Sequence, residues 1–82
     1  MSAVILYNDA NFSGDSLASD GDIYDMSATN YNDKTSSIQV NSGKWRFCTD
    51  ANFGGSCFEI SEGSYPNMGG YNDQISSFNR VG

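Results

Sequence analysis

The 82-residue sequence contains no histidine, a single proline, and four basic residues against ten acidic ones. Without histidine, the commonest general base at neutral pH and a frequent metal ligand are both missing. The formal net charge of −6 repels phosphate backbones and anionic lipids and attracts cations. We therefore expect no nucleic-acid partner and no membrane partner.

Long apolar runs and helix-forming residues are also scarce. No run approaches the roughly 20 apolar residues of a membrane helix, and the first residues lack the charged flank and length of a signal peptide. Leucine occurs only at Leu6 and Leu17, whereas Ser, Gly and Asn are abundant, which favours strands joined by turns. The sequence predicts a soluble all-β chain and leaves its compartment open.

The length and the apolar content set the size of the core. Aromatic residues make up 13% and apolar residues 38% of the chain, which is too much for a disordered segment. A chain this short buries only about 60% of its unfolded surface, so a second core is not expected. We predict one domain, residues 1–82, of modest stability that a bound ligand or metal would raise.

The two cysteines flank a Gly-rich stretch that is typical of a hairpin loop. Cys48 and Cys57 would then face each other across two strands. A disulfide and a pair of free, small apolar thiols are both open, whereas thiolate metal ligation would need more ligands than two cysteines supply. We favour the free thiols.

An internal repeat organises the chain. The segment 9–14 (Asp-Ala-Asn-Phe-Ser-Gly) reappears at 50–55, and the segment 31–38 (Tyr-Asn-Asp-Lys-Thr-Ser-Ser-Ile) reappears at 71–78. Two copies are too few for a solenoid, so they are expected to pack face to face around one core. The predicted motifs cover about residues 3–42 and 43–82.

Alternating strand patterns indicate the topology within each copy. Apolar and polar residues alternate over 3–7, 37–40, 45–48 and 57–60, as in strands with one buried face. Four short antiparallel strands per copy, with a long return connection, make a Greek key. Glu59 lies within the last of these segments with no partner marked by the sequence, so no paired-carboxylate catalyst is predicted, and we expect a protein that is not an enzyme.

Two signatures, each tied to one part of the repeat, resemble those of the βγ-crystallin superfamily. The first is an aromatic residue, four residues, an aromatic residue, any residue and Gly, and it occurs in full over Tyr7–Gly14. In the second copy Cys48 replaces the first aromatic residue, ahead of Phe53 and Gly55. The second signature, Asn or Asp twice, two free residues, Ser or Thr, then Ser, occurs at 32–37 and 72–77. The resemblance implies eight strands in two four-stranded antiparallel sheets, each borrowing one strand from the other motif.

The same resemblance implies two calcium sites. Calcium prefers 6 to 8 oxygen ligands and tolerates irregular loop geometry, and both hexamers offer oxygen ligands only. In the family the third residue of the hexamer gives its carbonyl and the fifth its hydroxyl, the second residue would supply charge, and a carbonyl comes from the folded hairpin, with the motifs contributing crosswise. The implied ligands are Asn8, Asp33, Lys34, Ser36, Thr49, Asp73, Gln74 and Ser76. Asn32 and Asn72 are expected to shape the loops, and Ser37 and Ser77 to close the hairpins.

Alternatives to a calcium protein are a pair of Asx-rich turns that bind nothing and a binding module for carbohydrate or protein in which calcium only stiffens the scaffold. A solvent-facing platform of Tyr24, Tyr65 or Trp45 would favour the module. With about one carboxylate per site, we expect dissociation constants of about 10⁻⁵ to 10⁻³ M, which suits calcium-rich or extracellular surroundings. The expected assembly state is a monomer.

Overall fold

Strands account for the regular structure of the computed structural model, which describes residues 3–26, 35–67 and 75–82. The chain alternates apolar and polar residues, so each strand presents one face to the interior. A short 3-10 helix, Ala51–Phe53, joins the fourth strand to the fifth. The strands are β1 (Val4–Asp9), β2 (Ser13–Ser19), β3 (Ser37–Val40), β4 (Trp45–Asp50), β5 (Gly54–Ile60), β6 (Gly63–Tyr65) and β7 (Ser77–Arg80).

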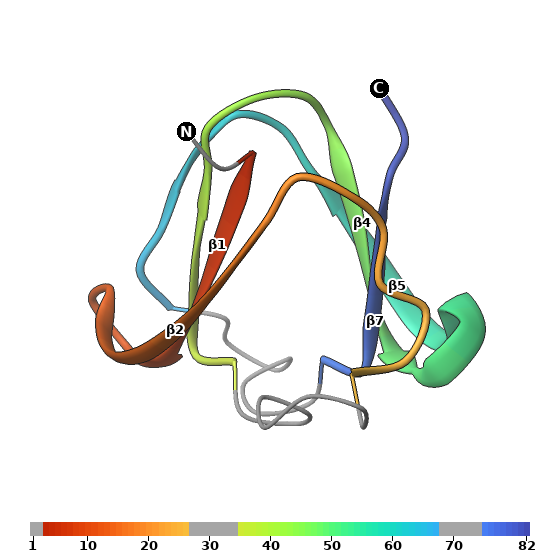
Figure 1. The fold of residues 1–82 in the computed structure, drawn as a ribbon, viewed down its shortest axis with the longest axis horizontal. Helices are drawn as coiled ribbons and strands as arrows, with labels where there is room; N and C mark the ends of the chain where they lie inside the picture. The colour runs from red at the N-terminus through yellow and green to blue at the C-terminus, as the bar shows by residue number, and fades with distance from the viewer. Residues whose placement is uncertain (1–2, 27–34, 68–74) are drawn as a thin grey trace.

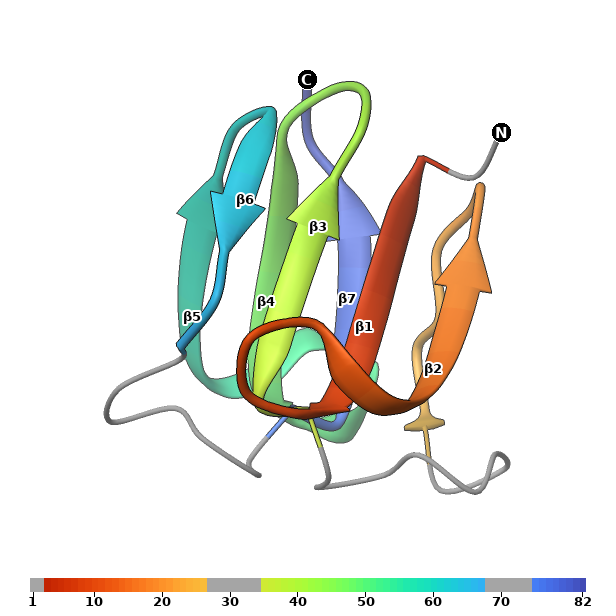
Figure 2. The same cartoon turned by 90° about the vertical axis from the view of Figure 1, so that its left-hand side faces the viewer.

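The strands form two antiparallel sheets that face each other (Figure 1). One has the order β2-β1-β3-β6 and the other the order β5-β4-β7. Figure 2 shows the first sheet in front of the second, with β6 at one edge and β2 at the other. The predicted all-β sandwich of two antiparallel sheets is confirmed.

Strand exchange between the two halves is also present. β6 belongs to the second half of the chain but pairs with β3 of the first half. In the opposite direction, Ile23 of the first half forms an isolated bridge with Phe78 of β7, through backbone hydrogen bonds of 2.9 Å in both directions. Each sheet therefore borrows a segment from the other motif, as the family resemblance implies.

The expected fourth strand of the second sheet is shortened to this single bridge, so the described residues form seven strands and not eight. On one side of the bridge the Arg80 amide donates to the Asp22 carboxylate at 2.9 Å and not to a backbone carbonyl. On the other side the Met26 amide donates to the Ser76 carbonyl at 2.8 Å, which moves the pairing on by one residue. A side-chain acceptor and a register slip thus end the ladder after one pair.

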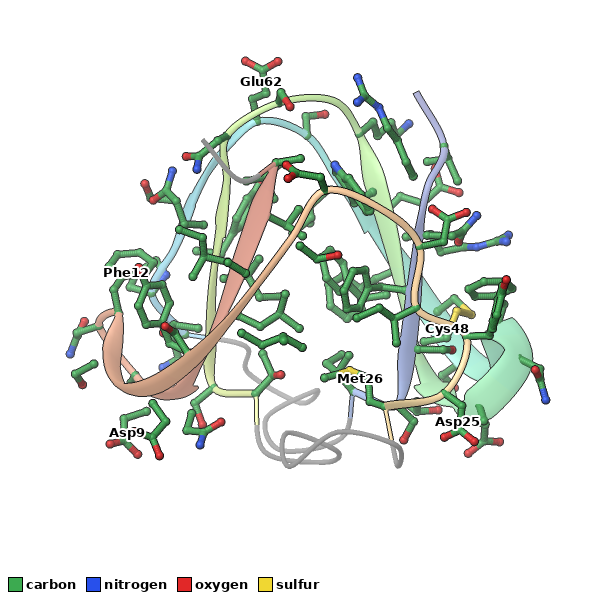
Figure 3. All side chains as sticks on the ribbon, viewed as in Figure 1. Asp9, Phe12, Asp25, Met26, Cys48 and Glu62 are labelled. Atoms are coloured by element: carbon green, nitrogen blue, oxygen red, sulfur yellow. A yellow bond between two sulfur atoms is a disulfide. The ribbon has the colours of Figure 1, made fainter. Side chains whose placement is uncertain are left out.

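The core lies between the sheets and draws on both halves. The Phe78 ring packs against two other rings, with centroids 5.9 Å from that of Trp45 and 5.4 Å from that of Phe47. Met26 is fully buried and closes the interior at one end (Figure 3). Burying these rings stabilises the folded state by about 25 cal/mol for each Å² of apolar area removed from water. The buried apolar side chains are Ala3, Val4, Leu6, Met26, Ile38, Val40, Trp45, Phe47, Ile75 and Phe78.

The two cysteines face each other across two strands as predicted, but the preference for free thiols is wrong. Cys48 and Cys57 are direct cross-strand partners of β4 and β5, and a disulfide joins them. The two Cα atoms lie 4.1 Å apart, because the hairpin register sets these positions opposite each other. The hairpin is thereby closed covalently.

None of the described residues belongs to a helix that is long and apolar enough to cross a membrane.

Candidate metal site

Each motif contains a hairpin that folds over in the same unusual way. In the first, Asn11 and Phe12 adopt φ of 58° and 59°, and in the second, Asn52 and Phe53 adopt φ of 57° and 61°. A left-handed conformation is uncommon for a residue other than glycine and costs about 1–3 kcal/mol unless neighbouring groups enforce it. Other hydrogen bonds must therefore hold both turns.

The last serine of each hexamer supplies that hold. The Phe12 amide donates to Ser37 Oγ at 3.0 Å, and Ser37 Oγ donates to the Asp9 carbonyl at 2.7 Å. In the second motif the Phe53 amide donates to Ser77 Oγ at 3.0 Å. Both serines are fully buried. Each hydroxyl thus bridges the two ends of a hairpin tip, as the resemblance implies.

Asn8 and Thr49 lie at the β-bulges of these hairpins. The register of β1 with β2 passes from Tyr7 to Asp9, and that of β4 with β5 passes from Cys48 to Asp50. At this step the register advances by two residues in β1 or β4 and by three in β2 or β5, so the extra residue lies in the second strand of each hairpin, and Asn8 and Thr49 stand opposite it, outside the regular register. The structure therefore places both predicted carbonyl donors at equivalent interruptions of the two sheets.

Ser36 and Ser76 lie beside these bulges. The Ser36 amide donates to the Tyr7 carbonyl at 2.8 Å, and the Ser76 amide donates to the Cys48 carbonyl at 2.9 Å. The acceptor is in each case the residue directly before the bulge, and both serines are only 8% exposed. The structure thus brings Ser36 close to Asn8, and Ser76 close to Thr49.

The other predicted ligands are Asp33, Lys34, Asp73 and Gln74, and they lie outside the described residues, together with Asn32 and Asn72. The two described segments that adjoin them begin at Thr35 and Ile75, immediately before the serine pairs. The crosswise contribution of the two motifs depends on the same residues. The full ligand set consequently stays a prediction.

Two carboxylates that sequence reasoning missed also border the hairpins. A β-carbon built on Gly14 would lie 2.9 Å from Asp9 Cγ, and one on Gly55 would lie 2.9 Å from Asp50 Cγ. Asp9 and Asp50 thus fold over equivalent glycines, each next to a bulge residue. Their equivalent positions in the two repeats are the sequence signal that could have identified them.

The donors suit a hard cation. The described part of each site offers hydroxyl and main-chain oxygens, and a carboxylate, Asp9 or Asp50, borders the hairpin. Within the described residues no three His, Cys, Asp or Glu side chains are grouped so as to hold a metal. The described donors are therefore mainly neutral oxygens, which are among the ligand types that calcium accepts.

The aromatic residues that would signal a ligand platform are not gathered at one surface. Trp45 is fully buried, with its indole Nε1 donating to the Ser42 carbonyl at 2.8 Å. Tyr65 is half-buried and donates its hydroxyl to the Ser61 carbonyl at 2.9 Å. Tyr24 is 64% exposed. Of the three residues, Tyr24 alone presents its ring to solvent.

Two facing antiparallel sheets, two related motifs and a segment exchanged in each direction define a two-motif Greek-key sandwich. The family model for Beta/Gamma crystallin matches residues 3–81. The chain belongs to the beta/gamma crystallin family.

Relatives of known structure have the same fold over nearly the whole chain. A beta/gamma-crystallin of Ciona intestinalis is 36% identical over 94% of this chain and 95% of its own length. A solved beta gamma crystallin from Ciona intestinalis has a TM-score of 0.92 at 34% identity, covering 95% of this chain and 98% of that chain. A solved betagamma-crystallin from an archaeon has a TM-score of 0.88 at 38% identity, covering 95% of each chain.

Proposed function

We propose that this beta/gamma crystallin domain binds two calcium ions, one at each hexamer, and that the ions stabilise its fold. The observation that supports the proposal is the repeated attachment of a hexamer serine to the strand just before a bulge. The Ser36 amide donates to the Tyr7 carbonyl, next to Asn8, and the Ser76 amide donates to the Cys48 carbonyl, next to Thr49. An Asx-rich turn that binds nothing would not need the same arrangement of oxygens in both halves of the chain.

In this proposal each ion takes the Ser36 or Ser76 hydroxyl, a bulge carbonyl and the carbonyl of Lys34 or Gln74. Asp33 and Asp73 supply one carboxylate per site. Bound calcium would neutralise that charge and tie the hexamer to the hairpin, and this chain's own residues would do no bond-making or bond-breaking chemistry. The proposed role is therefore structural and not enzymatic.

The net charge supports cation binding. The chain carries a formal charge of −6, which raises the local concentration of cations and penalises the folded state by self-repulsion. Two divalent ions would reduce this repulsion. Because one carboxylate per site gives little attraction, the expected dissociation constants are about 10⁻⁵ to 10⁻³ M.

A calorimetric calcium titration, combined with thermal melts in chelator and in millimolar calcium, tests the proposal. A ligand that binds only the folded state adds RT ln(1 + [L]/Kd), or about 2.7 kcal/mol at 100 times Kd. We expect two binding events and a higher melting temperature in calcium. An unchanged melting temperature and no heat of binding would refute the proposal.

The second candidate, a carbohydrate- or protein-binding module, has one observation in its favour. Tyr24 is exposed, its ring lies 6.0 Å from that of Phe53, and the Arg46 guanidinium lies 5.8 Å from the same Phe53 ring. Trp45 and Tyr65 do not extend this surface. A single exposed ring is a small platform for a sugar, so calcium binding is the function we put first.

A further inference from the structure

The two hairpins differ in what holds their ends together. In the β1–β2 hairpin the Tyr7 and Phe12 rings pack edge to face, with centroids 5.7 Å apart. In the β4–β5 hairpin Cys48 takes the position of Tyr7, and its cross-strand partner Cys57 takes the position of Ser16. A disulfide thus stands where the first motif has an aromatic pair, and the two cysteine positions lie on only one of the two layers (Figure 3).

In the second hairpin Phe53 has no aromatic partner at the position of Tyr7, and its ring packs against residues outside the hairpin tip. Phe53 contacts Tyr24 of the other motif at 6.0 Å and the Arg46 guanidinium at 5.8 Å, both measured to its ring. These groups lie towards the surface, since Tyr24 is 64% exposed. Within the hairpin itself, the covalent bond replaces the ring packing of the first motif.

The disulfide is adjacent to the proposed second calcium site on both strands. The Cys48 carbonyl accepts the Ser76 amide at 2.9 Å, and the next residue is the bulge residue Thr49. Thr49 Oγ1 accepts the amide of Ser56 at 3.0 Å, and Ser56 directly precedes Cys57. The two disulfide-linked residues therefore help to position both proposed calcium ligands, the Ser76 hydroxyl and the Thr49 carbonyl.

We propose that the Cys48–Cys57 disulfide is a redox control on the second calcium site, which binds calcium more tightly when the disulfide is intact. This inference rests on the calcium-binding function proposed above. Opening the bond removes the constraint on the Thr49 bulge, so part of the binding free energy is then spent on ordering it. The hairpin of the first motif contains no cysteine, so reduction leaves the constraint on its carbonyl donor Asn8 unchanged.

The chemistry is thiol–disulfide exchange with a dithiol reductant. Cys57 is exposed whereas Cys48 is fully buried, so a reductant thiolate attacks the Cys57 sulfur. A mixed disulfide forms on Cys57, and the Cys48 sulfur leaves as a thiolate, which then takes a proton from water. The second reductant thiol then attacks the mixed disulfide and releases Cys57. The protein ends with two thiols and the reductant with one cyclic disulfide.

Linkage makes the effect reciprocal. If the oxidised protein binds calcium at this site more tightly by some factor, then saturating calcium makes the disulfide harder to reduce by the same factor. A tenfold difference in calcium affinity corresponds to about 30 mV in the reduction potential of this two-electron couple. The redox equilibrium and the calcium titration therefore measure one quantity in two independent ways.

The test is a calcium titration of the oxidised and the dithiothreitol-reduced protein, followed at the backbone amide resonances of Ser36 and Ser76. Each amide donates to the residue before one bulge, so each reports calcium binding at one hairpin. On reduction we expect the Kd read at Ser76 to rise at least about fivefold, the lower end of usual couplings between linked sites. The Kd read at Ser36 should change less than about twofold, as for independent sites. The disulfide potential should be measured with and without calcium.

Two variants separate the outcomes. Cys57→Ser should bind calcium like the reduced protein under all conditions, whereas Ser16→Ala, at the matching position of the first hairpin, should bind like the oxidised parent. Equal affinities in both redox states, or equal weakening at Ser36 and Ser76, would overturn the redox proposal and leave calcium binding intact. Loss of near-ultraviolet aromatic dichroism on reduction would also overturn it, because the disulfide would then support the whole fold. Absence of binding in the oxidised protein would instead refute the calcium function itself.

Discussion

The substitution Ser77→Ala tests whether buried hydroxyls hold the folded hairpins. Ser77 Oγ accepts the Phe53 amide at 3.0 Å and donates to the Asp50 carbonyl at 2.6 Å, and it is fully buried. Alanine keeps the backbone and removes both hydrogen bonds. The Phe53 amide would then lose the contact that supports its positive φ of 61°.

The expected cost follows from the two lost bonds. Each typical hydrogen bond contributes about 0.5–1.5 kcal/mol net, so two give about 1–3 kcal/mol, before any penalty for leaving the partner groups unpaired. In a domain of this size 1 kcal/mol shifts the melting temperature by roughly 4–8 °C. A central loss of about 2 kcal/mol thus lowers it by about 8–16 °C.

Thermal unfolding of the calcium-free protein measures this loss. Ser37→Ala should cost a similar amount, because Ser37 makes the same two bonds in the first motif. Ser13→Ala is the matched control: its exposed hydroxyl donates one bond, to the Ala10 carbonyl at 2.8 Å, and its removal should cost at most about 0.5 kcal/mol. If Ser77→Ala melts within about 4 °C of the parent protein, the hydroxyl does not hold the hairpin.

Three further predictions separate ligand from scaffold. Asp73→Ala should weaken calcium binding in calorimetry while the calcium-free melting temperature stays nearly constant, and parent-like affinity would remove Asp73 from the site. Gly55→Val should destabilise the calcium-free protein by at least about 1–3 kcal/mol in thermal melts, because Gly55 has φ of 72° and its β-carbon would lie 2.8 Å from Asp50 Oδ2 and clash with Thr49 Oγ1. Parent-like melting would contradict that reasoning. The calcium-free protein should show near-ultraviolet aromatic fine structure from the buried Trp45, and a featureless spectrum would mean that the core needs metal.

The sequence repeat carried most of the information about the fold. Because the segments 9–14 and 50–55 match, both hairpins could be placed before any strand was assigned, and the alternation in 45–48 gave the buried face of β4. The repeat also located the hexamer serines, and Ser37 and Ser77 have the closing role that the family resemblance implied. Alternating patterns of this kind predict strands reliably because the apolar residues are those on the buried face.

The features that could not be predicted depend on contacts between distant residues. The fourth strand of the second sheet ends early because the Asp22 carboxylate takes an amide from β7. The sequence placed Cys48 and Cys57 opposite each other, but the oxidation state of two facing cysteines does not follow from a residue pattern.

The left-handed turns at Phe12 and Phe53 show most clearly why local sequence was insufficient. Phenylalanine disfavours positive φ, so propensity alone argues against both turns. Each is held from the other motif: the Asn11 amide donates to the Pro66 carbonyl, and the Asn52 amide donates to the Tyr24 carbonyl. Neither hairpin can complete its turn unless the opposite half is folded. The two motifs therefore fold as one cooperative unit.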